Sequence, residues 1–376
     1  MVRKASLFLP LVLVAVARAG VTAQPQKPAP PKPPRPSAVQ APRPSSGQAA
    51  AVERRLLEAS RRDPDSFDAE YQLASFYLQQ GKLQAALPHL ERAHAIDPTH
   101  DACGHDLALA LLELGKLDEA RAHVASLMGA HETAELHNLL GNVEERAGNF
   151  AGADPEYERA AHMAPTEEHL FDWGNNLLQL RAFEDAEKVF TPAIARHPRS
   201  ARLHVGLGIA QYSRGQYEDA VKSFCQAADL APSDPRPYQF LGEMYGVAPA
   251  LGEEITRRLA RFAKAQPRNA QAQFHYAMSL WKGQPVGAPS ANLRQIEGLL
   301  RRAVTLDTKF AKAFLELGIL LSDQQRYTEA IQELRHATRL APDLAQAHYR
   351  LSQAYQRTGQ KELAEKELAL FQRLSG

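Results

Sequence analysis

The chain has 376 residues, of which 44% are hydrophobic, and a formal net charge of +1. This composition is that of a folded protein, and it excludes a collagen-like, wholly disordered or polytopic membrane protein. From residue 51 onward, 37 basic residues stand against 43 acidic ones. A mildly acidic body does not suit a phosphate backbone, so we expect no nucleic-acid partner.

Residues 1–23 have the pattern of a secretory signal peptide. Two cations precede an uncharged, largely apolar run over residues 5–17, and small residues two apart follow it. We expect export to the periplasm or the exterior, with the mature chain starting at Gly20 or Gln24. The run is shorter than the roughly 20 residues that span a bilayer, which makes an uncleaved membrane anchor the weaker alternative.

Residues 24–50 form a second segment outside the fold. They hold nine prolines and no acidic residue, and their four cations are Lys27, Lys32, Arg35 and Arg43. Because proline fixes φ and removes amide donors, we expect an extended, solvated spacer in the polyproline II form. Its cations could alternatively bind an anionic cell envelope.

From Phe67 onward the sequence repeats with a period of about 34 residues. The nine segments begin near residues 67, 101, 134, 167, 201, 235, 270, 311 and 345. The eighth residue of each segment is small, as in Gly141 and Gly174, and the residue before it is large. Alanine follows twelve residues after the small one in seven of the nine segments, and proline closes six of them.

Each segment contains two amphipathic stretches separated by a turn such as Gln80-Gly81-Lys82. Small residues at fixed positions let two helices pack closely, and the closing proline ends the second helix. A single hairpin leaves one apolar face uncovered, so successive units have to stack. The sequence therefore predicts an all-α fold.

At these positions the chain resembles the tetratricopeptide repeat family over residues 67–376. The resemblance implies a right-handed α-solenoid of about nine stacked helical hairpins. Residues 51–66 resemble a lone second helix that caps the front of the stack.

Three features depart from the regular pattern. Residues 246–252 replace the compact turn of the sixth unit, and about seven extra residues lie around residues 283–289 in the seventh. Prolines also fall inside expected second helices, at Pro88, Pro155 and Pro192. An interior proline costs about 3 kcal/mol. We therefore expect the helix that contains Pro155 to start late, with Asp154 as its N-cap.

The sequence shows no clear chemical site. Eleven of the fourteen histidines lie between His89 and His204, but their spacings do not gather metal ligands, and we expect solvated surface histidines and no metal site. Cys103 and Cys225 belong to units three hairpins apart, beyond the ~7 Å limit of a disulfide, so we expect two separate thiols. No nucleophile motif or phosphate loop stands out, and we expect no enzymatic activity, no cofactor and no small-molecule substrate.

The family resemblance also implies a groove lined by positions 2, 5, 9 and 12 of each first helix. The candidate groove residues are Tyr71, Asn138, Asn142, Phe171, Asn175, Phe274, Trp281 and Tyr349. Asparagine amides can bind an extended peptide backbone, and the stretch from Asn138 to Asn175 is the expected seat. The family's clamp for a C-terminal carboxylate has lysine at position 5, where this chain has Asn138 and Phe171, so a chaperone tail is not implied.

These features predict a non-catalytic protein–protein interaction scaffold that binds a protein or peptide partner in or outside the cell envelope. The alternative is an accessory structural subunit of an envelope export, pilus or cell-wall assembly machine. The last second helix, about Lys361 to Leu374, carries Phe371 at a position that is usually alanine in the other units. We expect a solvated terminal repeat and a monomer.

Overall fold

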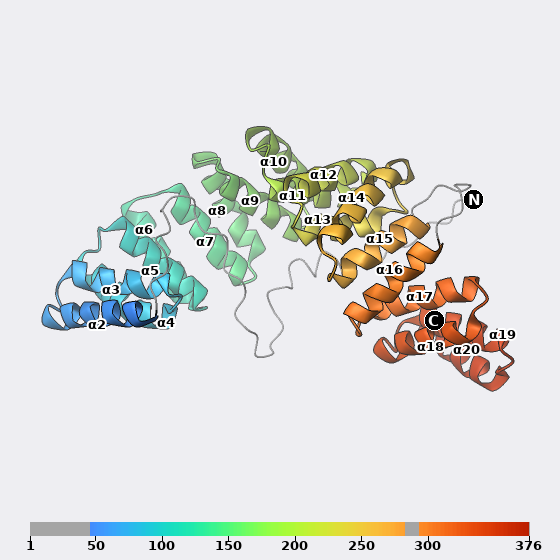
Figure 1. Cartoon of the computed structure of the whole chain (residues 1–376). Helices are drawn as coiled ribbons and strands as arrows, with labels where there is room; N and C mark the ends of the chain where they lie inside the picture. Colours follow the sequence, from blue (N-terminus) through green and yellow to red (C-terminus); the bar gives the residue numbers. More distant parts are fainter. Residues whose placement is uncertain (1–45, 283–292, 376) are drawn as a thin grey trace. The chain divides into compact units, whose positions relative to one another are not determined.

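The computed structural model describes residues 46–282 and 293–375. Within these ranges the chain is all-α, with nineteen α-helices, one short 3-10 helix and no strand (Figure 1). The signal-peptide prediction, most of the linker prediction and the extra residues around 283–289 lie outside the described residues. Among the helices described, none has both the length and the apolar character needed to cross a membrane.

First and second helices alternate along the chain and pair into hairpins (Figure 1). The first helices are α3 (Phe67–Gln79), α5 (Asp101–Glu113), α7 (Ala134–Arg146), α9 (Glu167–Gln179), α11 (Ala201–Ser213), α13 (Pro235–Met244), α15 (Ala270–Lys282), α17 (Ala311–Asp323) and α19 (Ala345–Arg357). The second helices are α4 (Leu83–Ile96), α6 (Leu117–Ala130), α8 (Phe150–Met163), α10 (Phe183–Arg196), α12 (Tyr217–Leu230), α14 (Gly252–Ala265), α16 (Leu293–Leu306), α18 (Tyr327–Leu340) and α20 (Lys361–Ser375). In the sixth hairpin the short helix η1 (Pro249–Leu251) takes the place of a compact turn.

The helix α2 (Ser46–Arg62) precedes the hairpins and packs against α3. It begins five residues earlier than the sequence predicts, so the end of the expected linker is helical. The chain has no proline between Pro44 and this helix, and alanine and glutamine favour helix there. The Ser60 hydroxyl donates to Glu70 Oε1 at 2.6 Å, which ties α2 to the first hairpin.

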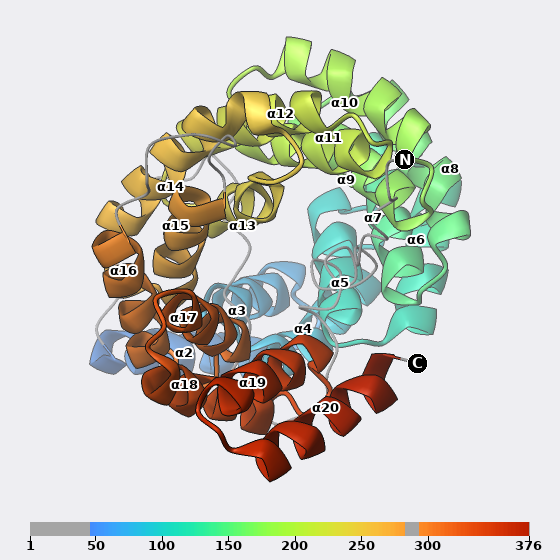
Figure 2. The same ribbon diagram turned by 90° about the vertical axis from the view of Figure 1, so that its right-hand side faces the viewer.

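The chain divides into two compact units. Unit 1 contains the described residues up to Pro165 together with Gln179–Arg181, and unit 2 contains Thr166–Leu178 and the described residues from Ala182 onward. Within unit 2, the first helices α11, α13, α15 and α17 lie on one side and the second helices α12, α14, α16 and α18 on the other (Figure 2).

Small residues set how closely the helices approach. A Cβ built on Gly174 would lie 2.5 Å from Cζ of Phe190, and one on Gly206 would lie 2.4 Å from the same atom. The fully buried Phe190 ring is therefore held between two glycines of neighbouring first helices. The same 16-residue spacing joins other glycines to a side chain in the second helix of their hairpin, namely Gly141 to Tyr157, Gly208 to Phe224 and Gly318 to Leu334.

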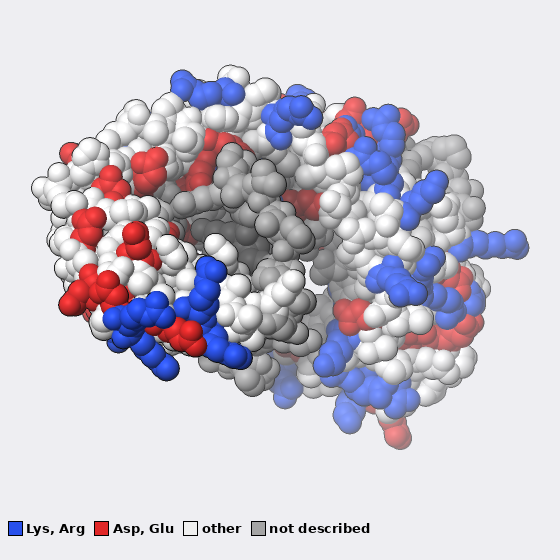
Figure 3. All heavy atoms as spheres, turned by 60° about the vertical axis from the view of Figure 1, so that its left-hand side comes forward, with Lys and Arg blue, Asp and Glu red and all other residues white. Residues whose placement is uncertain are grey.

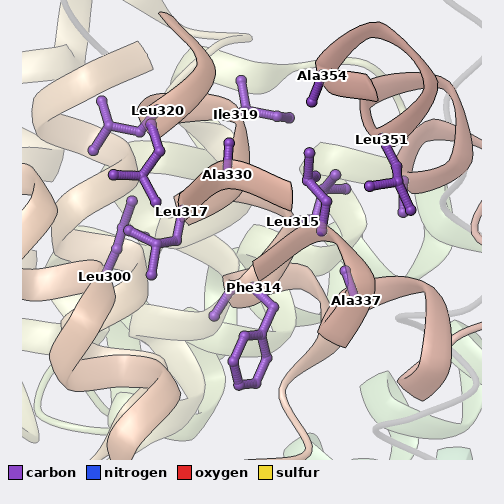
Figure 4. Packing of buried hydrophobic residues seen from close by; sticks show 14 of the residues in the cluster. Leu300, Phe314, Leu315, Leu317, Ile319, Leu320, Ala330, Ala337, Leu351 and Ala354 are labelled. Carbon is purple, nitrogen blue, oxygen red and sulfur yellow. The ribbon is translucent and has the colours of Figure 1, made fainter. Parts of the chain in front are cut away.

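Buried aliphatic side chains from consecutive helices form the core of the last hairpins (Figure 4). Leu300 of α16, Leu317 of α17 and Leu351 of α19 are at most 1% exposed. Burying such a side chain contributes about 1.5–3 kcal/mol, so each hairpin depends on the next for much of its stability. Alanines at Ala330 and Ala337 of α18 let the helices on either side come close.

The helix around Pro155 corrects one prediction. α8 begins at Phe150, where the Asn149 side chain accepts a hydrogen bond from the Gly152 amide at 3.1 Å, so the expected late start with Asp154 as N-cap is wrong. Exposure explains why interior proline is tolerated. The prolines are exposed at Pro88, Pro155 and Pro192, and so are the residues four positions earlier, Gln84, Ala151 and Lys188. Water can therefore hydrate the carbonyls that lose their donor.

The expectation of solvated surface histidines is wrong for several of them. The buried ones are His137, His169, His275 and His348. His137 and His348 are buried because carboxylates of the second helix satisfy their ring nitrogens.

Among the described residues, no group of three or more His, Cys, Asp and Glu could hold a metal ion. Cys103 and Cys225 are both buried and free, as the repeat spacing predicts.

Candidate functional site

The eight candidate groove residues fall in both units. Unit 1 carries three of them, Tyr71, Asn138 and Asn142, and unit 2 carries Phe171, Asn175, Phe274, Trp281 and Tyr349.

The asparagines of unit 1 are used inside their hairpin. Asn138 is only 7% exposed, which leaves little of it for a ligand. Asn142 Nδ2 donates to the Asn138 carbonyl at 2.9 Å, and its Oδ1 accepts from the Tyr157 hydroxyl at 3.4 Å. These contacts make Asn142 a residue that joins α7 to α8 rather than a free amide.

The half-buried Asn175 of α9 differs, because its side chain has no hydrogen-bond partner among the residues that the structure describes. Phe171 lies one turn earlier on the same helix, and residues four apart share a helical face. The Phe171 ring lies under the guanidinium of Arg202 from the next first helix, α11, with 4.8 Å from Cζ to the ring centroid. Asn175, Phe171 and Arg202 thus provide an amide, a flat ring and a cation on neighbouring first helices.

Glu167 holds Arg202 in this position. Nε of Arg202 donates to Glu167 Oε1 at 2.8 Å, and the Ser200 hydroxyl donates to the same oxygen. Burial alone would raise the pKa of Glu167, but the hydrogen bonds from Arg202 and Ser200 outweigh it and keep the pKa below its ordinary value. The carboxylate therefore stays charged. Sequence reasoning did not select Arg202, although it stands at position 2 of its helix and could be found by counting the groove positions of every unit.

Phe274 does not line a groove. Its side chain is 2% exposed and belongs to the hydrophobic core, so the prediction that its ring contacts a ligand does not fit the structure. The physical reason is packing, since the Phe274 ring lies 4.9 Å from the Phe310 ring, centroid to centroid, and an ion pair between α13 and α17 lies beside it. Lys312 Nζ of α17 lies 3.0 Å from Glu243 Oε1 of α13, and it also lies 5.8 Å from the centroid of the Phe274 ring. Trp281, at the other end of α15, is half-buried against the same core.

Tyr349 lies on the last first helix and is 37% exposed. Its ring centroid lies 5.0 Å from that of Phe371 in α20. In most of the other units the residue at the Phe371 position is alanine, which leaves room for a neighbouring hairpin. Here the larger Phe371 ring packs against Tyr349 instead.

The first helices of unit 2 are linked by polar contacts as well as by packing. Gln239 of α13 donates to Gln271 of α15 at 3.1 Å. The six first helices of this unit carry six acidic and six basic residues, so the row as a whole is electrically balanced. On the face drawn in Figure 3, acidic and basic side chains of the described residues are interspersed.

Sequence patterns of the tetratricopeptide repeat family match five segments of the chain. They cover residues 46–101, 77–143, 171–235, 320–359 and 345–375. Together these segments span more than half of the 376 residues.

Two curated proteins share part of the sequence. The human protein O-mannosyl-transferase TMTC1 is 24% identical over 167 residues, which are 43% of this chain and 19% of that protein. The mouse DnaJ homolog subfamily C member 3 is 29% identical over 149 residues, 37% of this chain and 29% of that protein. The chain thus spans less than a third of the length of either relative.

Among solved structures, YrrB is described as a TPR protein with an unusual peptide-binding site. It is 18% identical to this chain and superimposes with a TM-score of 0.41, covering 49% of this chain and 96% of YrrB.

Proposed function

We propose that this chain, which belongs to the tetratricopeptide repeat family, is a non-catalytic scaffold that binds an extended protein segment along the first helices of unit 2. Proteins of this fold generally act as interaction scaffolds. The observation that carries the proposal is the half-buried Asn175 amide, which stands beside the Phe171–Arg202 stack and forms no hydrogen bond within the described residues.

The chemistry of this surface indicates the kind of segment it binds. An amide side chain can donate to and accept from the backbone of an extended peptide at once. The Phe171 ring and the Arg202 plane offer a flat surface for an apolar or aromatic side chain. Since Glu167 already neutralises Arg202, the partner does not need a carboxylate at this point.

The pattern of residues 1–23 supports a cellular setting in or outside the cell envelope. An exported scaffold meets exported partners, so we look for the partner in the envelope or secreted fraction. This part of the proposal is independent of the binding surface and is tested by the N-terminus of the mature protein, which should be Gly20 or Gln24.

The binding surface is tested by calorimetry with a partner segment identified from that fraction. Asn175→Ala should weaken binding by about 1 kcal/mol, the usual net contribution of one hydrogen bond. Asn142→Ala should leave the affinity unchanged but lower the stability of unit 1, because Asn142 already bonds within its hairpin. Gln226→Ala, an exposed amide on the second helix α12, is the matched control. An affinity lowered equally by Asn175→Ala and Gln226→Ala would contradict the proposed surface.

A further inference from the structure

The two units differ in charge, although the whole chain is nearly neutral. Residues 46–165 carry 10 Lys and Arg against 20 Asp and Glu, whereas residues 166–376 carry 27 against 23. Residues 24–45, which come immediately before unit 1, carry four cations and no acid. The most acidic part of the chain therefore directly follows a basic one.

The acidic excess of unit 1 is concentrated on its first helices. Helices α3, α5 and α7 together hold eight acidic residues and a single Lys or Arg, Arg146. Three of the acidic residues have cationic partners inside the unit, namely Glu70 with Arg92, Glu113 with Arg146, and Glu144 with Arg121. The other five form no ion pair within the described residues, namely Asp68, Asp101, Asp106, Glu135 and Glu145.

Aromatic rings accompany these carboxylates at the start of α3 and α5. Phe67, Tyr71 and His100 form a cluster, with ring centroids 4.6–5.4 Å apart. The Tyr71 hydroxyl donates to Asp106 Oδ2 at 2.9 Å, which joins α3 to α5. Burial and the Asp106 carboxylate raise the pKa of Tyr71, so its hydroxyl remains a donor at neutral pH. Phe67 and Tyr71 pack in part against the hydrophobic core of unit 1, but all three rings are only half-buried, so part of each ring remains accessible.

We propose that this aromatic-acidic face, formed by Phe67, Tyr71, His100 and the carboxylates of Asp68, Asp101 and Asp106, binds the chain's own basic proline-rich segment, residues 24–45. Half-exposed aromatic rings suit proline rings, which is how proline-rich peptides are generally recognised. The four cations of the segment match the carboxylates that lack a cationic partner. This face and its occupant differ from the scaffold surface of unit 2 and its partner.

The position of the segment in the chain favours it over a separate basic peptide. Residue 45 leads directly into α2, which Ser60 joins to Glu70 of α3, the helix that carries Phe67 and Tyr71. A tether of this kind gives an effective concentration on the order of millimolar, which a free competitor has to exceed. If residues 24–45 are extended in the polyproline II form, which advances about 3.1 Å per residue, they would be long enough to cross both α3 and α5. The face of unit 1 is therefore occupied by its own chain until a stronger basic ligand or high salt displaces the segment.

Zero-length carbodiimide cross-linking of the full chain tests this contact directly, because it joins an amine only to a carboxylate in contact with it. At low salt we expect cross-links within one molecule from Lys27 and Lys32 to peptides that contain Asp68, Asp101 or Asp106. At 0.5 M salt they should be lost, since screening weakens exposed charge pairs. Cross-links that go only to second helices or to unit 2 would overturn the proposal.

A labelled synthetic peptide of residues 24–45 provides the second measurement, by fluorescence anisotropy. We expect it to bind at least tenfold more tightly to a full chain whose four tail cations are replaced by glutamine than to the natural chain, because the tethered segment no longer competes. In that background, Asp68→Asn with Asp106→Asn should weaken binding at least tenfold. The control is Glu58→Gln with Glu91→Gln, two exposed acidic residues on α2 and α4, which should leave binding unchanged.

Circular dichroism shows whether each variant is folded, and the cross-linking result stands even if a variant is not. Equal affinity of the peptide for the natural and the tail-neutralised chain would contradict tethered competition. Binding of the peptide to vesicles that contain phosphatidylglycerol, with none to the protein, would overturn the proposal and assign the segment to a membrane surface instead.

Discussion

The ring nitrogen Nδ1 of His137, in α7, lies 2.6 Å from Oε2 of Glu156, in α8. Nε2 of the same buried ring lies 2.7 Å from Oε1 of Glu132, so both nitrogens meet a carboxylate. The same spacing of 19 residues joins Glu70 to His89 and His348 to Glu367, each at 2.6 Å. A histidine–glutamate pair therefore connects the first helix to the second in three of the hairpins, at a position where the other hairpins have different pairs.

Replacing His137 should weaken unit 1 more than an equivalent change on the surface. We expect His137→Phe to lower the free energy of unfolding by about 2 kcal/mol, because hydrogen bonds to charged groups contribute about 1.5–3 kcal/mol. His162→Phe is the matched control, since His162 is 3.7 Å from Glu158 and both side chains are at least half exposed. Urea unfolding followed by circular dichroism gives the free energy of unfolding of both variants. Equal decreases would show that the buried histidine–glutamate contact stabilises the fold no more than the exposed one.

Stability should fall as the pH falls from 6.5 to 4. Burial, the largest cause, lowers the pKa of His275 from 6.5 to about 4, while the Glu243 carboxylate acts in the opposite direction and Lys312 adds to the decrease. In this window the unfolded chain binds a proton at His275 that the folded chain does not, so the stability present above pH 6.5 is lost at up to about 1.4 kcal/mol per pH unit.

His275→Phe keeps a ring of similar size and removes the imidazole that takes up a proton. Thermal unfolding of both proteins across this pH range should show a shallower decline for the variant. If the natural chain and His275→Phe lose stability in parallel, another group is responsible for the decline.

The contacts of Phe190 predict that alanine is too large at Gly206. A Cβ there would lie 2.4 Å from the ring, and overpacking of this kind costs about 1–3 kcal/mol. Gly298→Ala, in the middle of α16 with no atom within 4 Å of the new Cβ, should instead stabilise by about 0.5–1 kcal/mol. Adding Phe190→Leu should recover part of the loss from Gly206→Ala, and chemical denaturation can compare the three variants. A Gly206→Ala chain as stable as the natural one would show that the helices separate at no cost.

The start of each first helix could be read from the sequence because repetition supplies nine independent observations of one pattern. The nine first helices begin at the nine positions from which the repeats were counted. Pro155 was misjudged because the cost of an interior proline depends on whether water reaches the freed carbonyl, and a single segment does not show this. The burial of His137 and His348 was missed because their glutamate partners lie 19 residues away on the other helix of the hairpin.

The candidate site could be predicted only in part, because a single repeat does not show the contacts made by neighbouring helices. Counting positions identifies side chains on the first-helix face, and it found Phe171 and Asn175. Counting positions within a repeat does not show which side chains of neighbouring helices cover these residues. Phe274 is covered by the hydrophobic core, where its ring packs against Phe310, and Arg202 is held in place by Glu167 of the preceding hairpin.

Exposed apolar side chains on α20 could form a contact between two copies of the chain. α20 exposes Leu363 and Leu374 at 44% and 36%, whereas Phe371 is drawn toward Tyr349. We expect a monomer, because charged neighbours such as Glu365 and Lys366 interrupt this surface. Light scattering over a hundredfold range of concentration should give a constant monomer mass. A constant dimer mass that Leu370→Glu with Leu374→Glu abolishes would refute this.

The central claim is that the first helices of unit 2 bind a protein partner. A photo-crosslinking amino acid placed at Asn175, at Tyr349 or at the control position Lys222 on the second helix α12 tests it most directly in cells that produce the chain natively. The account predicts one discrete cross-linked protein from Asn175 and from Tyr349, and none from Lys222. The same adduct from all three positions, or an adduct from Lys222 alone, would contradict it.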